Sequence, residues 1–358
     1  MGEGAREAEK SGSGKREAGK EERQPSRRAR VLVAIAIGAA SVGLLLIYRL
    51  HSSRPSDFDQ VWFGARAIWS GQNPYQLIGP GRAFHWDWPL YYPATALMLI
   101  SPLALLPVAV ARCVFVAGSA ALLAYGLTRE SWVRLPLFAS CAFMVAVVAA
   151  QWSPLMTAVL CMPALAWVVS AKPNIGLALL AADPRARTLG AAALGAIVMI
   201  VASLVLLPSW PRDWIAITRA APHFTIPLLH RGGFLLALVL LRWRRPEARL
   251  LAALAILPQN MVIYDTLPLF VIPRTFRQAL VLATLNNAGF AAGLLLINPH
   301  PQSTSANYYG GDLLVACAYL PAMVMVLMRP NEGALPAWIE RRVPWLRARS
   351  GSESLDIG

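Results

Sequence analysis

Long apolar blocks separated by short polar stretches dominate the hydrophobic pattern of this chain. Unbroken examples cover residues 31–47, 189–207 and 313–328, and each is close to the roughly 20 residues that a helix needs to cross the apolar core of a bilayer. Shorter apolar pieces follow one another between these blocks. The pattern predicts an all-α polytopic membrane protein.

Taken in order, the apolar pieces give about twelve predicted transmembrane segments. They cover residues 31–50, 90–107, 113–127, 135–150, 155–171, 175–182, 189–207, 234–241, 250–257, 267–272, 280–297 and 313–328. The shortest pieces can also be half-helices or re-entrant segments. On this division, residues 1–30 form a basic cytoplasmic tail, residues 31–328 a single transmembrane domain and residues 329–358 a second cytoplasmic tail.

Composition supports a membrane protein and argues against nucleic-acid binding. Hydrophobic residues make up 56% of the 358 positions and charged residues 15%, compared with about 25% charged residues in soluble domains. The net charge of +14 is divided among separate short clusters instead of one continuous basic surface. Residues 1–30 carry nine Lys or Arg and six Glu among Gly and Ser, which is the composition of a disordered tail.

The arginine clusters predict which way each loop faces. Clusters at residues 184–187, 242–249 and 274–277 fall on one side when the predicted segments alternate, and cytoplasmic loops carry the excess of Lys and Arg. Both termini are then cytoplasmic. The outward loops are residues 51–89, 208–233 and 298–311. Because these loops are rich in aromatic, acidic and histidine residues, we expect an extracytoplasmic site on a plasma (inner) membrane.

Common cofactor and metal motifs are missing from the sequence. It contains no Walker loop, no dinucleotide fingerprint and no zinc-protease motif. The four cysteines lie apart in apolar stretches, so we expect buried hydrophobic residues and neither disulfides nor zinc ligands. No cofactor and no metal site are predicted, with a divalent cation at Asp57 and Asp59 left open as an alternative.

The first outward loop contains two acids, Asp57 and Asp59, ahead of a helical stripe of apolar residues. Ser56 followed three residues later by Asp59 matches a capping box, which gives Asp59 a structural explanation. Asp57 is not needed for that pattern, although an acid in the first turn also complements the helix dipole. A carboxylate beside a bilayer is costly unless it is solvated, paired or functional. Asp57 is therefore the candidate catalytic residue.

A single carboxylate beside basic residues suits glycosyl transfer. Attack by a sugar hydroxyl on an activated anomeric carbon needs a base that takes the hydroxyl proton, whereas a glycosidase ordinarily uses two carboxylates. Cations near a departing phosphate would stabilise its charge. The outward candidates are Lys172, Arg219, His223, His230 and Arg231. For each of them, snorkelling or contact with lipid headgroups is the alternative explanation.

Aromatic residues concentrate at residues 84–93, which include His85, Trp86 and Tyr92. Such a segment is typical of an interfacial aromatic belt, and it is also suited to hold sugar rings or a prenyl chain. Polar residues at 259–265 interrupt a second apolar region. They indicate either a cavity or a structural network of hydrogen bonds.

Three short landmarks follow one another within residues 55–185. They are Asp57-Phe58 with the run Gly-Gln-Asn-Pro-Tyr at 71–75, Tyr92-Pro93-Ala94 with Ser-Pro-Leu-Ala-Leu-Leu-Pro at 101–107, and Ala171-Lys172-Pro173. Their order and spacing resemble the polyprenyl-phosphate-mannose-dependent transferases of glycosyltransferase family 87, within the GT-C superfamily. The chain departs from that family at Ala94, where a second proline is usual, and at residues 257–261, which lack the family's late Ser-Pro…Trp…His pattern.

The resemblance implies a GT-C-like helical bundle with interfacial helices in its outer loops. It also implies an inverting transferase that moves a hexose, expected to be mannose, from a polyprenyl-phosphate sugar to an extracytoplasmic glycolipid or glycan. By position, Asp57 corresponds to the general base of that family. The candidate substrate contacts are Asp59, Tyr75, His85, Trp86, Tyr92, Lys172, Arg219, His223, His230 and Arg231.

Two other functional classes remain open at the level of sequence. A transporter or flippase of lipid-linked sugars also suits many spans with broken helices, although the polar residues gather in outward loops and not at mid-membrane. A noncatalytic scaffold of an envelope-assembly complex is the third class, and it predicts that Asp57 and Lys172 can be replaced without consequence.

Overall fold

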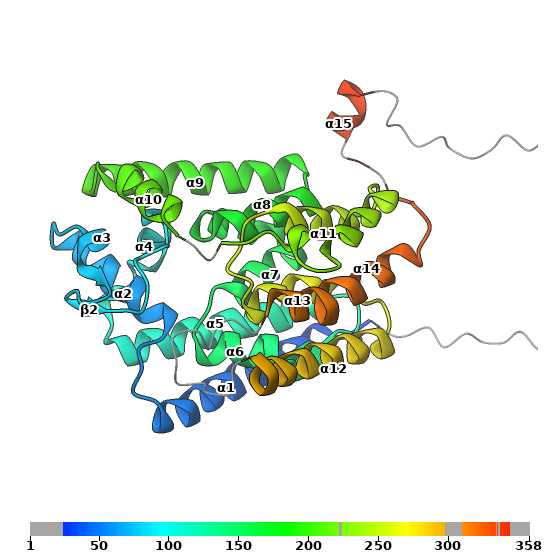
Figure 1. Ribbon diagram of the computed structural model, residues 1–358, viewed down its shortest axis with the longest axis horizontal. Coiled ribbons are helices and arrows are strands. Elements are labelled where there is room, and N and C mark those ends of the chain that lie inside the picture. Colours follow the sequence, from blue (N-terminus) through cyan, green and yellow to red (C-terminus); the bar gives the residue numbers. More distant parts are fainter. Residues whose placement is uncertain (1–23, 222–223, 298–309, 334, 336, 344–358) are drawn as a thin grey trace, which may run out of the picture.

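A computed structural model describes residues 24–221, 224–297, 310–333, 335 and 337–343. These residues form a mostly helical bundle (Figure 1). Most of the two predicted tails, most of the third outward loop (residues 298–311) and His223 lie outside the described residues. The first helix begins at Arg27, within the predicted N-terminal tail, and the last apolar helix ends at Leu327, close to the predicted end of the transmembrane domain at residue 328.

The helices are short except for a few long apolar ones. In chain order they are α1 (Arg27–His51), α2 (Asp57–Trp69), α3 (Pro74–Leu77), α4 (Ala94–Ile100), η1 (Leu103–Leu105), α5 (Val108–Leu127), η2 (Leu135–Ala139), α6 (Cys141–Val148), α7 (Ser153–Cys161), η3 (Pro163–Ala171), α8 (Pro173–Ala182), α9 (Ala186–Leu206), α10 (Trp210–Arg219), η4 (Pro227–Leu229), η5 (Gly233–Arg242), α11 (Pro246–Ile256), η6 (Ile263–Val271), α12 (Phe276–Ala292), η7 (Gly293–Ile297), α13 (Gly311–Leu314), η9 (Val315–Tyr319), α14 (Leu320–Leu327) and α15 (Ala337–Arg342). A parallel pair of two-residue strands, β1 (Ile78–Gly79) and β2 (Phe84–His85), lies between α3 and α4.

Four helices within the described part of the chain are long and apolar enough to cross a membrane: α1, α5, α9 and α12 with the start of η7. The outer face of α9 exposes Leu194, Ile197, Val201 and Val205, as expected for a helix that faces lipid. The prediction of a largely helical membrane protein is confirmed at this level. The remaining apolar pieces are shorter, and prolines in the first turns of α7, α8 and α11 explain where those helices begin.

The bundle has two ends, which we name after one acid at each. α1 and α5 run antiparallel, since Arg30 near the start of α1 donates a hydrogen bond to the carbonyl of Tyr125 near the end of α5, at 2.8 Å. At the Asp57 end lie α2, α3, α4, α10 and the strand pair, to the left in Figure 1. At the opposite, Glu247 end lie the start of α11 and the connection between α8 and α9.

Residues 90–107, predicted as one membrane span, stay at the Asp57 end. They form α4 and η1, with a bend at Ser101-Pro102. The carbonyl of Leu106 accepts a hydrogen bond from Trp62 Nε1 on α2 at 3.1 Å, so the segment ends beside α2, at the Asp57 end. Pro102 lacks the amide donor that would continue the helical ladder, which explains the correction.

Residues 155–171, also predicted as one span, form a hairpin of two short helices. α7 and η3 meet at Met162, where the backbone leaves the helical region. Cys161 and Pro163 lie at the Glu247 end, whereas Thr95 of α4 donates to the carbonyl of Ser170 at 2.7 Å. The first correction removes one predicted crossing and the second adds one. The predicted directions of the later segments are therefore unchanged. The loop around Gln151, however, lies at the Asp57 end and not opposite to it.

Candidate functional site

Asp59 is fully used by the fold. Its Oδ2 accepts a hydrogen bond from the backbone N–H of Ser56 at 2.7 Å, which is the acidic half of the predicted capping box. Its two carboxylate oxygens also accept from Arg112 Nε and Nη2 of α5, both at 2.8 Å. Asp59 is 5% exposed and Arg112 8%. A bidentate pair at this depth fixes the start of α2 against α5, so the structural explanation of Asp59 is confirmed.

Asp57, two residues earlier, is held by neutral amides. Its backbone N–H donates to the carbonyl of Ala149 at 3.0 Å. Gln60 Nε2 donates to its Oδ1 at 3.2 Å, and Gln151 Nε2 donates to its Oδ2. Burial raises the pKa of Asp57 from 3.8 to about 6, while the Gln151 hydrogen bond and the charge of Lys172 act in the opposite direction. Asp57 is therefore a stronger base than an ordinary aspartate, and it is still mostly ionised at neutral pH.

A cavity of about 500 Å³ opens beside the Asp57 carboxyl group. Aromatic and amide side chains from α2, the 86–93 segment, α10 and the start of η6 supply most of its wall. The lining residues are Asp57, Gln60, Trp86, Trp88, Tyr91, Tyr92, Pro93, Gln151, Ala171, Lys172, Pro173, Asn174, Trp214, Thr218, Phe224, Pro258, Asn260, Tyr264 and Asp265. Flat aromatic faces and scattered hydrogen-bond partners are a wall that suits a ring bearing hydroxyl groups.

Lys172 is the one cation among the described residues that line this cavity. It stands between η3 and α8, and its Nζ forms an ion pair with Asp265 Oδ1 at 2.5 Å. The same ammonium lies 5.1 Å from the centre of the Tyr264 ring. Asp265 is 3% exposed, so it holds Lys172 in place at the cavity wall while Asp57 has no cation bonded to it among the described residues.

Two backbone positions next to the cavity adopt the left-handed conformation without being glycine. Ala150 has φ 49° and immediately precedes Gln151; Met261 has φ 51° and immediately follows Asn260. Non-glycine residues rarely adopt this conformation, and it costs roughly 1–2 kcal/mol per residue. Such strain is concentrated at functional sites. Here it turns the chain so that Gln151 faces Asp57 and Asn260 faces the cavity.

The aromatic wall is cross-linked by hydrogen bonds. Tyr92 Oη donates to Gln151 Oε1 at 3.2 Å, so Gln151 connects the aromatic wall to Asp57. Tyr75 Oη donates to the carbonyl of Tyr92 at 3.0 Å. On the other side, Trp214 Nε1 of α10 donates to the carbonyl of Tyr91 at 2.9 Å. The wall is therefore one connected unit of α3, α10 and the 86–93 segment.

The cavity brings together some of the sequence-predicted residues. Asp57, Trp86, Tyr92 and Lys172 line it. Asp59 and Tyr75 are buried behind the wall, where they act on the backbone and on Tyr92. The region at residues 259–265 was predicted to form either a cavity or a hydrogen-bond network, and it does both. Asn260, Tyr264 and Asp265 line the cavity. Gln259 accepts a hydrogen bond from Tyr319 at 3.2 Å.

The other predicted candidates lie outside the cavity lining. His85 is exposed on β2, and Arg219 ends α10. His230 Nδ1 lies 3.0 Å from Asp312 Oδ1, and its Nε2 lies 3.1 Å from Thr225 Oγ1. The side chain of Arg231 is 94% exposed and 3.7 Å from the same acid. His230 and Arg231 therefore tie the second outward loop to α13, and neither lines the Asp57 cavity.

Sequence reasoning missed Gln60, Gln151 and the pairing of Lys172 with Asp265. Gln151 carries a weak signal, because it is a lone amide between two apolar segments and precedes a Trp-Ser-Pro turn. Its partner is 94 residues away in the chain, and neither periodicity nor motif spacing reports on such a distance. Gln60 lies on the polar side of the first turn of α2, where an amide needs no special explanation.

No group of three or more His, Cys, Asp or Glu side chains that could hold a metal ion occurs among the described residues. Comparisons with known proteins add no assignment: no family model, no curated protein and no solved structure matches this chain. The residues and their geometry therefore carry the functional argument alone.

Proposed function

We propose that this protein is an inverting membrane glycosyltransferase that takes a hexose, expected to be mannose, from a polyprenyl phosphate. The acceptor would be a hydroxyl group of an extracytoplasmic glycolipid or glycan. The observation that carries the proposal is Asp57, a carboxylate with a pKa of about 6 that faces an aromatic cavity and is oriented by Gln60 and Gln151. The sequence resemblance to glycosyltransferase family 87 rests on the same acid and supplies the expected donor class.

The reaction needs one proton acceptor and one stabilised leaving group. The acceptor oxygen attacks the anomeric carbon and forms the new glycosidic bond while its proton passes to an Asp57 carboxylate oxygen. The bond between the anomeric carbon and the phosphate oxygen breaks, and the phosphate leaves with the electron pair. Lys172 is the cation positioned in the wall to stabilise that charge. Attack from the opposite face inverts the anomeric centre.

The membrane arrangement completes the proposal. The four long apolar helices, together with the shorter apolar helices, would make up about twelve crossings, with both termini cytoplasmic and the Asp57 end extracytoplasmic. The aromatic residues of the 84–93 segment and α10 would then lie at the outer interface, where Trp and Tyr are enriched. A prenyl chain would lie between helices, in the plane of the membrane, with its phosphate at the depth of Lys172.

The direct test is Asp57→Asn, compared with Asp87→Asn. Asp87 is an exposed acid of the same outward loop and does not line the cavity. Purified variants would be given labelled polyprenyl-phosphate mannose and an acceptor pool of total envelope lipids in neutral detergent. We expect Asp57→Asn to lower the rate of sugar transfer by about 10²–10⁴, and Asp87→Asn to transfer at the parent rate.

Folding of both variants is checked by thermal unfolding. A folded Asp57→Asn protein with full transfer would falsify the role of Asp57 as base. A parent protein that moves labelled lipid across reconstituted vesicles but transfers no sugar would reject the transferase and favour a flippase.

A further inference from the structure

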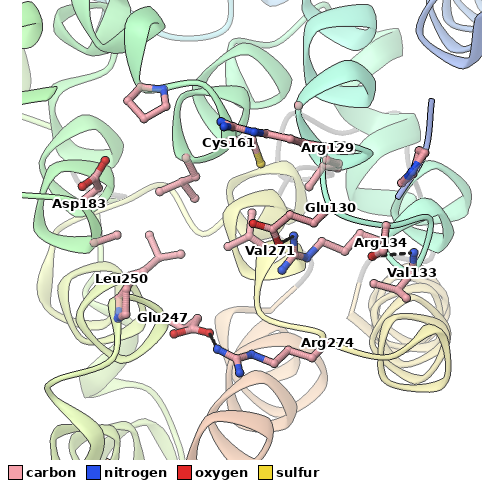
Figure 2. Close-up of a pocket in the computed structure, with 18 of the residues that line it drawn as sticks. Arg129, Glu130, Val133, Arg134, Cys161, Asp183, Glu247, Leu250, Val271 and Arg274 are labelled. Atoms are coloured by element: carbon pink, nitrogen blue, oxygen red, sulfur yellow. Dashed lines mark hydrogen bonds and ion pairs between the residues drawn. The ribbon is translucent and has the colours of Figure 1, made fainter. Parts of the chain in front are cut away.

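A second and larger cavity, of about 1070 Å³, opens at the Glu247 end of the bundle. It is lined by the start of α1, the end of α5, the 129–134 connection, the α7–η3 turn, the α8–α9 connection and the start of α11 (Figure 2). Neither the sequence resemblance nor the proposed transfer reaction uses this cavity. Its wall contains five arginines and three acids: Arg30, Arg129, Arg134, Arg185, Arg274, Glu130, Asp183 and Glu247.

Two of the three acids are already neutralised within the protein. Asp183 accepts from Arg185 Nε at 2.6 Å and Nη2 at 2.7 Å. Glu247 Oε1 accepts from Arg274 at 3.1 Å and from Arg329 at 3.0 Å. Arg185 and Arg274 are therefore occupied, and the charge balance of the cavity is decided by the remaining arginines and Glu130.

None of the three remaining arginines has an ion pair with a carboxylate shorter than 3.9 Å among the described residues. The exposed side chain of Arg129 forms no hydrogen bond or ion pair within the described residues, and it extends alongside Cys161 (Figure 2). Arg30 Nη2 donates to the carbonyl of Tyr125, and its guanidinium lies 4.1 Å from the centre of the Tyr125 ring, but its buried Nε has no hydrogen-bond partner among the described residues. Arg134 Nε donates to the carbonyl of Pro273 at 3.2 Å, and its Nη1 lies 3.9 Å from Glu130, whose side chain is 77% exposed. A pair so long and so exposed contributes little.

A buried guanidinium donor without an acceptor is costly. Arginines that serve only to orient a membrane protein can keep their charge in solvent. The buried Nε of Arg30 at the cavity wall is therefore not explained by orientation alone. Phosphate matches this wall, because arginine donors recognise its oxygens bidentately. Apolar side chains, including Leu160, Leu250 and Val271, line the same cavity and suit the less polar part of a larger molecule.

We propose that this cavity binds a phosphate-bearing anion, with Arg30, Arg129 and Arg134 as its contacts. The ligand chemistry is a phosphate group with at least two free oxygens, supplied either by the headgroup of an anionic phospholipid or by a soluble phosphate. The cavity lies at the ends of the apolar helices α1 and α5, which is the depth at which basic pockets bind lipid headgroups. The proposal does not depend on glycosyl transfer.

The test measures binding to the purified full-length protein and to two variants. Arg129→Gln removes a cavity arginine whose side chain forms no hydrogen bond or ion pair among the described residues, so it should fold normally. Arg277→Gln is the matched control, because Arg277 is exposed at the same end on α12 and does not line the cavity. Thermal unfolding would be followed in neutral detergent with inorganic phosphate against chloride at equal ionic strength, and in nanodiscs of phosphatidylglycerol against phosphatidylcholine.

We expect a rise in melting temperature with at least one phosphate source for the parent and for Arg277→Gln. In Arg129→Gln the apparent Kd should be weaker by about tenfold or more. A response to inorganic phosphate assigns a soluble ligand, and a response to phosphatidylglycerol alone assigns a lipid headgroup. No response to either source overturns the proposal. So does a response that is equal in all three proteins, or one that Arg277→Gln loses as fully as Arg129→Gln.

Discussion

The two ends of this bundle carry cavities of opposite character. At the Asp57 end, Asp57 and Asp265 face a single lysine, and the wall is aromatic. At the Glu247 end, five arginines face three acids and the cavity is about twice as large. The first arrangement leaves a carboxylate without a bonded cation, and the second leaves arginines without acids. A carboxylate of this kind can accept a proton, whereas surplus arginines can only bind an anion.

The difference follows from how each acid is satisfied. Asp59, Asp183, Glu247 and Asp265 each have a cationic partner within 3.1 Å, as an ion pair or a charge-assisted hydrogen bond. Asp57 has amide donors from Gln60 and Gln151 instead. Amides orient a carboxylate and leave its pKa near 6, whereas a bonded guanidinium would make it a weak base. The predictions below test this contrast, from the largest effect to the smallest.

The pair of Asp59 and Arg112 should be structural only. In Asp59→Asn the buried guanidinium of Arg112 loses its counter-charge, and we expect the free energy of unfolding to fall by about 3–5 kcal/mol. The measurement is chemical or thermal unfolding in detergent. Asp59→Asn combined with Arg112→Leu should recover much of that loss, and transfer should return with it. If the double variant is stable but inactive, Asp59 takes part in the reaction and the contrast with Asp57 is wrong.

Lys172 should serve the reaction at the Asp57 end. Lys172→Met alone would leave the buried Asp265 without its counter-charge. The informative variant is therefore Lys172→Met with Asp265→Asn, which removes both charges. We expect this variant to fold and its rate of transfer to drop by about 10²–10³, because the departing phosphate loses its electrostatic partner. Arg185→Gln, at the opposite end, should transfer normally. Normal transfer by the double variant would remove Lys172 from the mechanism.

Gln151 should act as a positioning residue for Asp57. Because its hydrogen bond lowers the pKa of Asp57, Gln151→Leu should raise that pKa by about one unit or more. For a rise of about two units, transfer at pH 7 would fall roughly tenfold and recover at higher pH. A purely structural role for Gln151 would lower transfer by the same factor at every pH, so a complete pH profile of kcat separates the two explanations.

The pH dependence of the parent protein gives the smallest effect. Asp57 must be ionised to accept a proton, and its pKa is about 6. Activity should therefore be nearly full at pH 8, about half at pH 6 and about a tenth at pH 5. Binding of phosphatidylglycerol at the Glu247 end should not change over this range, because arginine and a phosphodiester both keep their charge. A rate that is independent of pH from 5 to 8 would contradict the assignment of Asp57.

Several features were determined by the sequence alone. Apolar blocks of membrane-spanning length place the chain among helical membrane proteins, because a bilayer demands that backbone groups be satisfied within each segment. The spacing of Ser56 and Asp59 predicts a capping box, since capping involves residues three apart. Polar residues at 259–265 mark a costly interruption, and three of them line the cavity.

Other features were decided only by the tertiary structure. Gln151 reaches Asp57 across 94 residues, and Lys172 reaches Asp265 across 93, so no local pattern records either contact. The turn of residues 90–107 back to α2 and the hairpin of α7 and η3 depend on where short helices pack, because an apolar segment of this length can cross a bilayer or fold back against its neighbours. Sequence chemistry therefore singled out Asp57 as a costly acid, and packing placed amides beside it instead of a bonded cation.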